Sequence, residues 1–297
     1  MVIGAGRAGA RLTIANLAVV TLFVAIATMV TSTGQPADTD TWWHLKTGQL
    51  IWQQGRIPLS DPFSHTVAGA PWIDHGWLVQ AILWPFYQAF GLGGLALLLA
   101  AAITLTFAIV YKQCAGRPYL AALAVLLAAI SSSVVWAIRP QIASLLLTAA
   151  VTFLLYRYRE SGQARWLWPI PLLVVMWVNC HGGFVIAFIL LGCHLVGEVL
   201  NRLLHSDPER PLPAAQPRLR PLLLTLLACL PATLLNPNTY KMLPYAFQTV
   251  SVGPLQDYIQ EWAPPNFHSL QIQPFVWLLL LTMGALGLSR RRANWID

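Results

Sequence analysis

The membrane topology predicted for this chain depends on the stretch Gly76-Trp-Leu-Val-Gln-Ala-Ile-Leu-Trp-Pro-Phe-Tyr-Gln-Ala-Phe90. It lies in a sequence that is 57% hydrophobic and only 10% charged, with a mean hydropathy of +0.60, as is typical of polytopic membrane proteins. The stretch is apolar enough to cross a bilayer, but it contains Pro85 and runs into Gly91-Leu-Gly-Gly94. Whether it crosses the membrane or lies along the surface determines the side on which every later loop lies.

The distribution of positive charge favours the surface placement. Cytoplasmic loops of membrane proteins are enriched in Lys and Arg. With residues 76–90 at the interface, fourteen of the eighteen basic residues fall on the cytoplasmic side. The basic residues that remain outside are Lys46, Arg56, Arg139 and Lys241. We therefore predict that residues 32–92 form the first extracytoplasmic loop and that both termini are cytoplasmic.

The apolar runs predict an all-α fold of about eight transmembrane helices in a single transmembrane domain, residues 1–297. The predicted spans are roughly 12–31, 93–111, 119–137, 141–157, 166–180, 183–203, 221–236 and 273–289. The first could be a cleaved signal peptide, but its length favours a retained anchor. Residues 206–221 are predicted to be a non-helical, Pro-rich cytoplasmic connector, and residues 237–272 a second extracytoplasmic segment.

The net charge of +7 is mostly this orientation signal, with a weak attraction to anionic lipid. No pattern in the sequence indicates a nucleic-acid partner. The basic residues therefore indicate how the chain is oriented rather than what it binds.

An acidic motif, Asp38-Thr-Asp40-Thr-Trp-Trp-His44, follows the first span directly. The two carboxylates could bind one divalent cation such as Mg²⁺ or Mn²⁺, or one could act as a general base. Alternatively, Asp40 is the N-cap of an interfacial helix predicted over residues 41–54. His44 is a catalytic candidate beside the acids or an interfacial ring that faces lipid headgroups.

Further polar groups fall on the same side of the predicted topology. Asp74 and His75 form an acid and imidazole pair within the first loop. Arg139 stands at the outer end of a span, where it either binds a lipid phosphate or extends to the membrane surface. Asn179 and His181 lie in the outer turn between two spans. We take all five as substrate-binding candidates.

The second extracytoplasmic segment adds four candidates for substrate binding. Tyr240 and Lys241 lie near its start, and Glu261 and Trp262 lie near its end. Lys241 could hold a phosphate, and Trp262 could stack on a sugar or sit at the membrane interface.

The order of these features resembles the GT-C class of membrane glycosyltransferases, which includes protein O-mannosyltransferases, the bacterial aminoarabinose transferase and catalytic subunits of oligosaccharyltransferase. Asp38-Thr-Asp40 looks like the acidic motif of that class. Residues 41–54 and 76–90 look like its two extracytoplasmic juxtamembrane helices. The Asp-Thr-Asp order differs from the Asp-Glu of the mannosyltransferase branch.

The resemblance implies an enzyme that transfers a sugar from a polyprenyl-phosphate-linked donor, with inversion, at the extracytoplasmic face. The implied acceptor is a lipid, a glycan or a protein, and the implied location is the bacterial inner (plasma) membrane. In this interpretation Asp38 or Asp40 serves as the catalytic base or as a metal ligand, while His44 stays the catalytic candidate that its place beside the acids indicates. Two alternatives stay open: a transporter or flippase for a related lipid, and a non-catalytic membrane assembly subunit.

Overall fold

A computed structural model describes residues 14–32, 38–114, 118–204, 218–253, 264–270 and 272–288. These residues form helices joined by loops, with no strand among them. The α-helices are α1 Ile14–Ser32, α2 Thr39–Gln54, α3 Trp77–Gln113, α4 Pro118–Ser132, α5 Gln141–Ser161, α6 Pro169–Cys180, α7 Val185–Leu204, α8 Leu219–Thr233, α9 Met242–Val250 and α11 Gln273–Leu288. Short 3-10 turns are η1 Ser133–Val135, η2 Ala164–Trp166, η3 Gly182–Phe184 and η4 Thr239–Lys241.

Four of the helical segments in the described ranges are long and apolar enough to cross a membrane. They are Trp77–Gln113, Pro118–Val135, Gln141–Ser161 and Gly182–Leu203. Shorter apolar helical segments cover Val19–Thr28, Ala164–Cys180, Leu219–Thr233 and Gln273–Leu288. A helix therefore lies at each of the eight predicted spans, whereas the count of eight membrane crossings stays a prediction.

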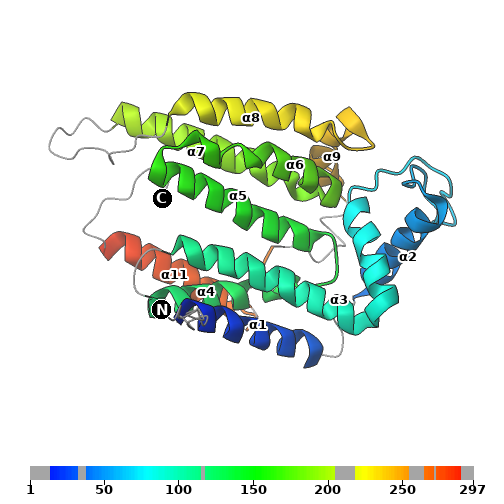
Figure 1. Cartoon of the computed structure of the whole chain (residues 1–297), viewed down its shortest axis with the longest axis horizontal. Coiled ribbons are helices and arrows are strands. Elements are labelled where there is room, and N and C mark those ends of the chain that lie inside the picture. Colours follow the sequence, from blue (N-terminus) through cyan, green and yellow to red (C-terminus); the bar gives the residue numbers. More distant parts are fainter. Residues whose placement is uncertain are drawn as a thin grey trace, which may run out of the picture.

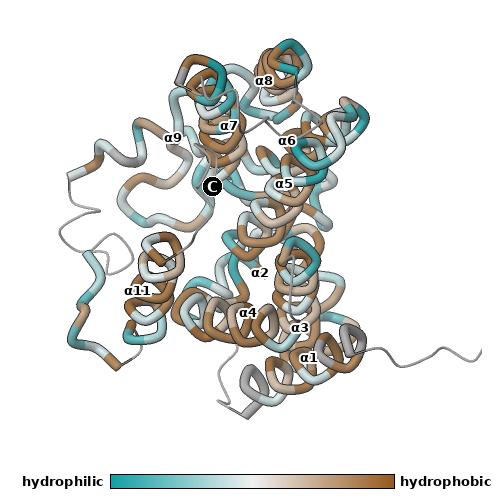
Figure 2. Tube along the Cα trace, turned by 90° about the vertical axis from the view of Figure 1, so that its left-hand side faces the viewer, coloured by the Kyte–Doolittle hydropathy of each residue, from teal (hydrophilic) through white to brown (hydrophobic). Residues whose placement is uncertain are grey.

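The outer surfaces of the long helices are apolar. Only 11% of the most apolar part of Pro118–Val135 is buried within the protein, and α11 has no buried residue. Figure 2 shows the long helices nearly end-on and mostly coloured as hydrophobic. Because water would penalise so much exposed apolar surface, these faces fit a lipid environment.

A sharp bend divides α3 into two parts. Gly91 has φ 61° and ψ −159°, a backbone conformation outside the helical range that glycine adopts without steric cost. Residues 77–90 cross the right-hand end of the bundle beside α2, and the remainder of α3 runs along the bundle (Figure 1). The bend at Gly91 separates residues 76–90, whose placement determines the predicted topology, from the predicted span 93–111.

The first part of α3 packs closely on α2. A Cβ atom at Gly48 would collide with the backbone carbonyl of Gln80, so the two helix backbones touch at this point. The Trp52 indole also donates a hydrogen bond of 2.8 Å to the carbonyl of Ala81. The two helices therefore form a fixed pair at one end of the bundle.

Two buried clusters form the core. One joins α1, α2, α3 and α4, with Leu95 and Ile103 fully buried. The other joins α5 to α9 through residues such as Trp177 and Leu191. The two halves meet along α3 and α5. At one end of this junction the segment before α5 contacts α2, through the hydrogen bond from the Thr41 hydroxyl to the Ile138 carbonyl.

Two predicted boundaries need correction. The helix predicted to begin at Thr41 begins at Thr39, because Asp38 and not Asp40 is its N-cap. The connector predicted to be non-helical up to residue 221 gives way to α8 at Leu219. Pro221 lies in the first turn of α8, where a missing backbone N–H breaks no helical hydrogen bond.

Candidate functional site

Asp38 and Asp40 have different local roles. One carboxylate oxygen of Asp38 accepts hydrogen bonds from the backbone N–H groups of Asp40 (3.0 Å) and Thr41 (3.1 Å), and the Asp38 N–H donates in return to the Thr41 hydroxyl oxygen. This reciprocal pattern is a capping box that fixes the start of α2. The side chain of Asp40 takes no part in the cap, so the capping role predicted for Asp40 belongs to Asp38.

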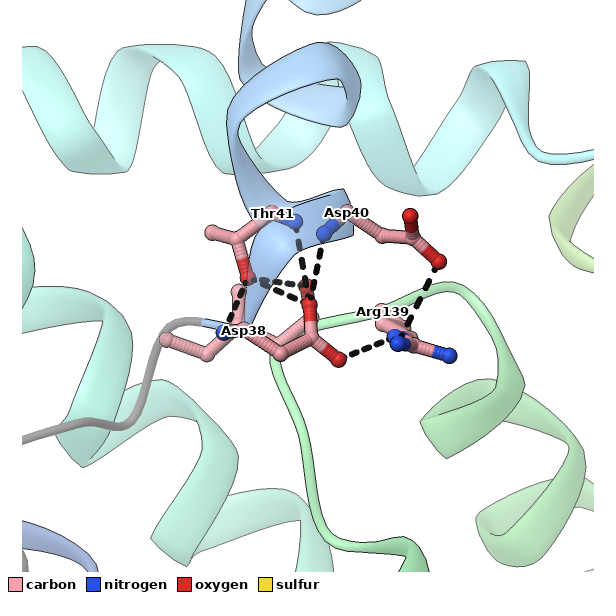
Figure 3. A network of polar contacts seen from close by, with 5 residues as sticks. Asp38, Asp40, Thr41 and Arg139 are labelled. Carbon is pink, nitrogen blue, oxygen red and sulfur yellow. Dashed lines mark hydrogen bonds and ion pairs between the residues drawn. The ribbon is translucent and has the colours of Figure 1, made fainter. Parts of the chain in front are cut away.

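Arg139 joins both acids (Figure 3). Its guanidinium forms an ion pair with Asp38 and lies 3.3 Å from a carboxylate oxygen of Asp40. The Thr41 hydroxyl also bonds to the carbonyl of Ile138 at 3.3 Å, which ties the start of α2 to the segment that carries Arg139. The Arg139 side chain is only 17% exposed, so it contacts protein carboxylates rather than extending to the surface.

The charges of this triad do not balance. Two carboxylates face one guanidinium, which leaves one negative charge when both acids are ionised. The Asp40 side chain is 42% exposed, whereas that of Asp38 is 29% exposed and held in the cap. Of the two acids, Asp40 is thus the one that an incoming molecule can reach.

A buried polar chain lies near this triad. The Gln80 side-chain nitrogen contacts Nδ1 of His44 (3.1 Å) and Oδ1 of Asp74 (3.0 Å). His44 is 6% exposed and Asp74 3% exposed. Burial raises the pKa of Asp74 to about 6, partly offset by hydrogen bonds from Gly76 and Gln80. His44 of α2 and Asp74 of the loop before α3, both predicted from sequence, therefore meet through the amide of Gln80, which was not predicted.

His75 and His181 extend the polar cluster toward the second half of the bundle. Their rings lie 5.5 Å apart between centroids in an edge-on arrangement. Nδ1 of His75 bonds to the Tyr245 hydroxyl at 2.8 Å. Nδ1 of His181 bonds to the Ser144 hydroxyl at 2.8 Å and accepts the Gly183 N–H at 3.0 Å. Tyr245 and Ser144 thus bring α9 and α5 to the same place.

The surroundings of all three histidines favour the neutral imidazole. Burial lowers the pKa of His44 to about 3, with further lowering by His75, Arg139 and His181. Burial also lowers the pKa of His75 to about 4, and burial together with His75 lowers that of His181 to about 4. At neutral pH the cluster therefore contains three uncharged rings beside one buried acid.

Asn179 is engaged within the protein. Its carbonyl oxygen accepts hydrogen bonds from Trp77 (2.8 Å) and Asn236 (3.1 Å). Its amide nitrogen donates to the carbonyls of Val175 and Leu235, each at 2.8 Å. These contacts tie α6 to α3 and to the segment after α8, a structural role beside the predicted one.

A small apolar cavity of about 70 Å³ has Arg139 of the triad in its wall. Its walls come from both parts of α3 and from the start of α5, and Arg139 is its one charged wall residue. An apolar space next to a guanidinium suits a ligand that has a charged head and an apolar tail.

The second predicted segment contributes less than expected. The side chain of Tyr240 is 67% exposed and that of Lys241 is exposed on η4, whereas the residue of this region that reaches the histidines is Tyr245. Glu261 and Trp262 lie outside the described residues. Gln80, Ser144 and Tyr245 were missed from sequence, although a lone amide or hydroxyl in an apolar helix must find a partner once it is buried.

A divalent cation would meet competition at the acid pair. Arg139 already contacts oxygens of both Asp38 and Asp40. Within the described ranges, no group of three or more His, Cys, Asp or Glu side chains is arranged to hold a metal ion. A cation at this position would have to displace the guanidinium, and metal dependence stays a prediction.

The chain was compared with known proteins in three ways. No family model, no curated protein and no solved structure matches it. The site described above therefore carries the functional argument by itself.

Proposed function

We propose that this protein is an integral membrane glycosyltransferase that takes its sugar from a polyprenyl-phosphate-linked donor. The observation that carries the proposal is the placement of Asp40 beside Arg139, which also forms part of the wall of an apolar cavity. A reachable carboxylate, a guanidinium and an apolar space in one place match the three parts of such a reaction: an acceptor hydroxyl, a phosphate and a lipid tail.

The reaction follows from these groups. The acceptor hydroxyl oxygen attacks the anomeric carbon, and the bond from that carbon to the phosphate oxygen breaks, with its electron pair staying on the phosphate. Asp40 takes the proton of the hydroxyl as general base. Arg139 shifts part of its interaction from the two acids to the leaving phosphate as negative charge develops there. Attack opposite the leaving group inverts the configuration at the anomeric carbon.

The position of the site supports an enzyme over a transporter. Asp38, Arg139 and His181 all lie at or next to helix ends, and α2 lies at one end of the bundle in Figure 1. Substrate sites of secondary transporters lie near the middle of the membrane instead. We place this end of the bundle on the extracytoplasmic side of a bacterial inner membrane, with both termini cytoplasmic and all eight predicted spans crossing the membrane.

Labelling from outside tests the orientation. Val67 is 54% exposed on the loop between α2 and α3, so a cysteine there should react with a membrane-impermeant thiol reagent added to intact cells. A Lys112→Cys variant, at the opposite end of α3, should react only after the cells are opened. The reverse pattern would contradict the proposed orientation.

A transfer assay tests the reaction. Radiolabelled sugar is supplied on native polyprenyl-linked lipids to membranes that contain wild type, Asp40→Asn or the control Asp61→Asn at matched levels. Asp61 caps its own turn by accepting the N–H groups of Phe63 and Ser64, so the control carries the same substitution outside the triad. Loss of a general base should lower transfer by about 100-fold or more in Asp40→Asn alone. Equal transfer by all three proteins would exclude Asp40 as the base.

Two further arms separate the remaining alternatives. Loss of transfer when a chelator is added to the wild type would show that the reaction needs a divalent cation. A protein that is folded and correctly oriented but transfers no sugar under any of these conditions would favour the assembly subunit.

A further inference from the structure

We infer that Gln80 is a positioning residue that, held by Asp74, fixes His44 as the neutral imidazole with its proton on Nε2. The assignment goes beyond the proposed reaction, because it states which nitrogen of His44 donates and which accepts. It depends on the hydrogen bonds of one buried amide.

The buried amide of Gln80 has two polar partners. The side chain is fully buried, and a single nitrogen, Nε2, contacts both Oδ1 of Asp74 and Nδ1 of His44. An amide NH₂ group has two hydrogens, so it can donate one to each partner. Nδ1 of His44 is then an acceptor, and the ring proton must be on Nε2.

The nitrogen and oxygen of a glutamine amide can exchange places, so the partners of the amide decide its orientation. In the opposite orientation the amide oxygen would face the carboxylate of Asp74. Two acceptor oxygens in contact within a buried site repel each other, and the amide oxygen has no hydrogen to donate to Asp74. An ionised Asp74 therefore selects the orientation in which Gln80 donates to His44.

The ring of His44 is enclosed by the protein. Trp43 packs against it with 3.7 Å between ring centroids, which restricts rotation of the imidazole. Burial lowers the pKa of His44 to about 3, so the ring stays neutral at physiological pH and a choice between two tautomers exists. The charged and titratable groups around the Asp74 and His44 pair are His75 from the loop, Arg139 before α5, His181 before η3 and Tyr245 from α9.

The same pattern occurs independently at His181. The backbone N–H of Gly183 can only donate, and it donates to Nδ1 of His181. That ring therefore also has its proton on Nε2. The cluster contains at least two neutral rings whose Nε2–H groups are hydrogen-bond donors.

The tautomer changes the role of His44. A ring with its proton on Nε2 can donate to an oxygen at that atom but cannot take a proton there. If the proposed function holds, His44 donates to an oxygen of the sugar or phosphate, and the general base is Asp40 rather than His44. The role of His44 as a donor to the substrate rests on the proposed function, whereas the position of its ring proton does not.

Nitrogen-15 NMR of protein labelled at histidine tests the tautomer directly, in lipid nanodiscs at about pH 7.5. A His44→Gln variant assigns the signals by their loss. In wild type we expect a protonated Nε2 and an unprotonated Nδ1 at His44. A wild-type ring with the proton on Nδ1 would overturn the inference, and this measurement needs no variant of Gln80.

Two substitutions test the cause. Gln80→Leu removes the donor, and Asp74→Asn removes the charge that orients it, so both should give a mixture of the two His44 tautomers. Gln113→Leu is the matched control, because Gln113 is on the same helix and its amide bonds instead to the carbonyl of Ala149. If His44 keeps a single tautomer in both Gln80→Leu and Asp74→Asn, Gln80 does not position the ring.

The NMR result and the transfer assay can fail separately. A wild type with the expected tautomer that transfers no sugar would leave the positioning role intact and remove the proposed function. A wild type that transfers sugar but has the His44 ring proton on Nδ1 would remove the positioning role of Gln80 and leave the proposed function intact. In an active protein, His44→Gln should keep at least tenfold more transfer than His44→Phe, because only glutamine can donate an N–H.

Discussion

Gly48 of α2 lies directly against the backbone of Gln80 in α3, with no room for a side chain between them. The same glutamine bonds to His44 on the preceding turn of α2. The close approach of the two helices and the polar chain that includes His44 therefore depend on one another.

Gly48→Ala should separate the two helices. The added methyl group would collide with the Gln80 carbonyl and with Cβ of Trp84, and overpacking of this kind costs about 1–3 kcal/mol. Thermal unfolding in detergent should show a lower midpoint for Gly48→Ala. Gly93→Ala is the control, because a Cβ atom at Gly93 meets nothing within 4 Å. An unchanged midpoint for Gly48→Ala would mean that the helices can move apart without cost.

Substitutions of Asp38 should distinguish the stability that comes from its N-cap hydrogen bonds from the stability that comes from its charge. Asp38→Asn keeps an oxygen that can accept the Thr41 N–H, whereas Asp38→Ala loses the cap and should destabilise the protein by about 0.5–2 kcal/mol more. Asp40→Ala, which removes no cap, should cost less than Asp38→Ala. Urea unfolding followed by circular dichroism measures the three differences. An equal loss in Asp38→Asn and Asp38→Ala would assign the effect to the ion pair with Arg139.

Acid should destabilise the histidine cluster. The pKa values of His44, His75 and His181 are lowered from 6.5 to between about 3 and about 4, so the unfolded chain binds more protons than the folded one below pH 6.5. The stability from each ring is present above pH 6.5 and is lost as the pH falls, by up to about 2 kcal/mol at pH 5. Asp74 acts in the opposite sense, because its pKa is raised from 3.8 to about 6 and its contribution is lost as the pH rises through that range.

Because three rings oppose one acid, the net stability should fall between pH 7 and pH 5. Unfolding midpoints measured at both pH values check this. His75→Gln should reduce the acid sensitivity, whereas the control His65→Gln changes an exposed ring on the same loop and should not. Equal acid sensitivity in the two variants would show that His75 is not one of the causes.

Tyr245→Phe should loosen α9 from the site. The substitution removes the hydrogen bond from the Tyr245 hydroxyl to His75 and should cost about 0.5–1.5 kcal/mol. Tyr240→Phe is the control, since that hydroxyl belongs to a side chain that is 67% exposed. Proteolysis of the native protein, read at the segment after α8, should be faster for Tyr245→Phe only. Equal rates would contradict a docking role for Tyr245.

The sequence predicted the helices well because long apolar runs have few alternatives in a bilayer. It also predicted a structural break after residue 90, since Gly91 and its neighbours follow directly. It placed Asp38, Asp40, Arg139 and His181 on one side of the membrane, and the structure brings these residues to the same end of the bundle.

The sequence did not predict which polar side chains would pair with one another. The pairing of Arg139 with the acids depends on how α2 packs on the segment before α5, which no local pattern specifies. Asp38 is the N-cap because α2 begins two residues earlier than predicted, and the start of a helix decides which carboxylate meets its free N–H groups. No local pattern distinguishes Gln80, Ser144 and Tyr245 from other helix residues. Only the packing of the helices places them beside the histidines.

The amides of Asn179 and Asn236, which link α6 to the segment after α8, carry no titratable group. This joint should therefore hold at any pH that leaves the protein intact, while the neighbouring imidazoles gain protons. Mild acid should consequently open the molecule from one side only: amide hydrogens of α2 and of residues 77–90 should exchange first, and those of α6 should stay protected.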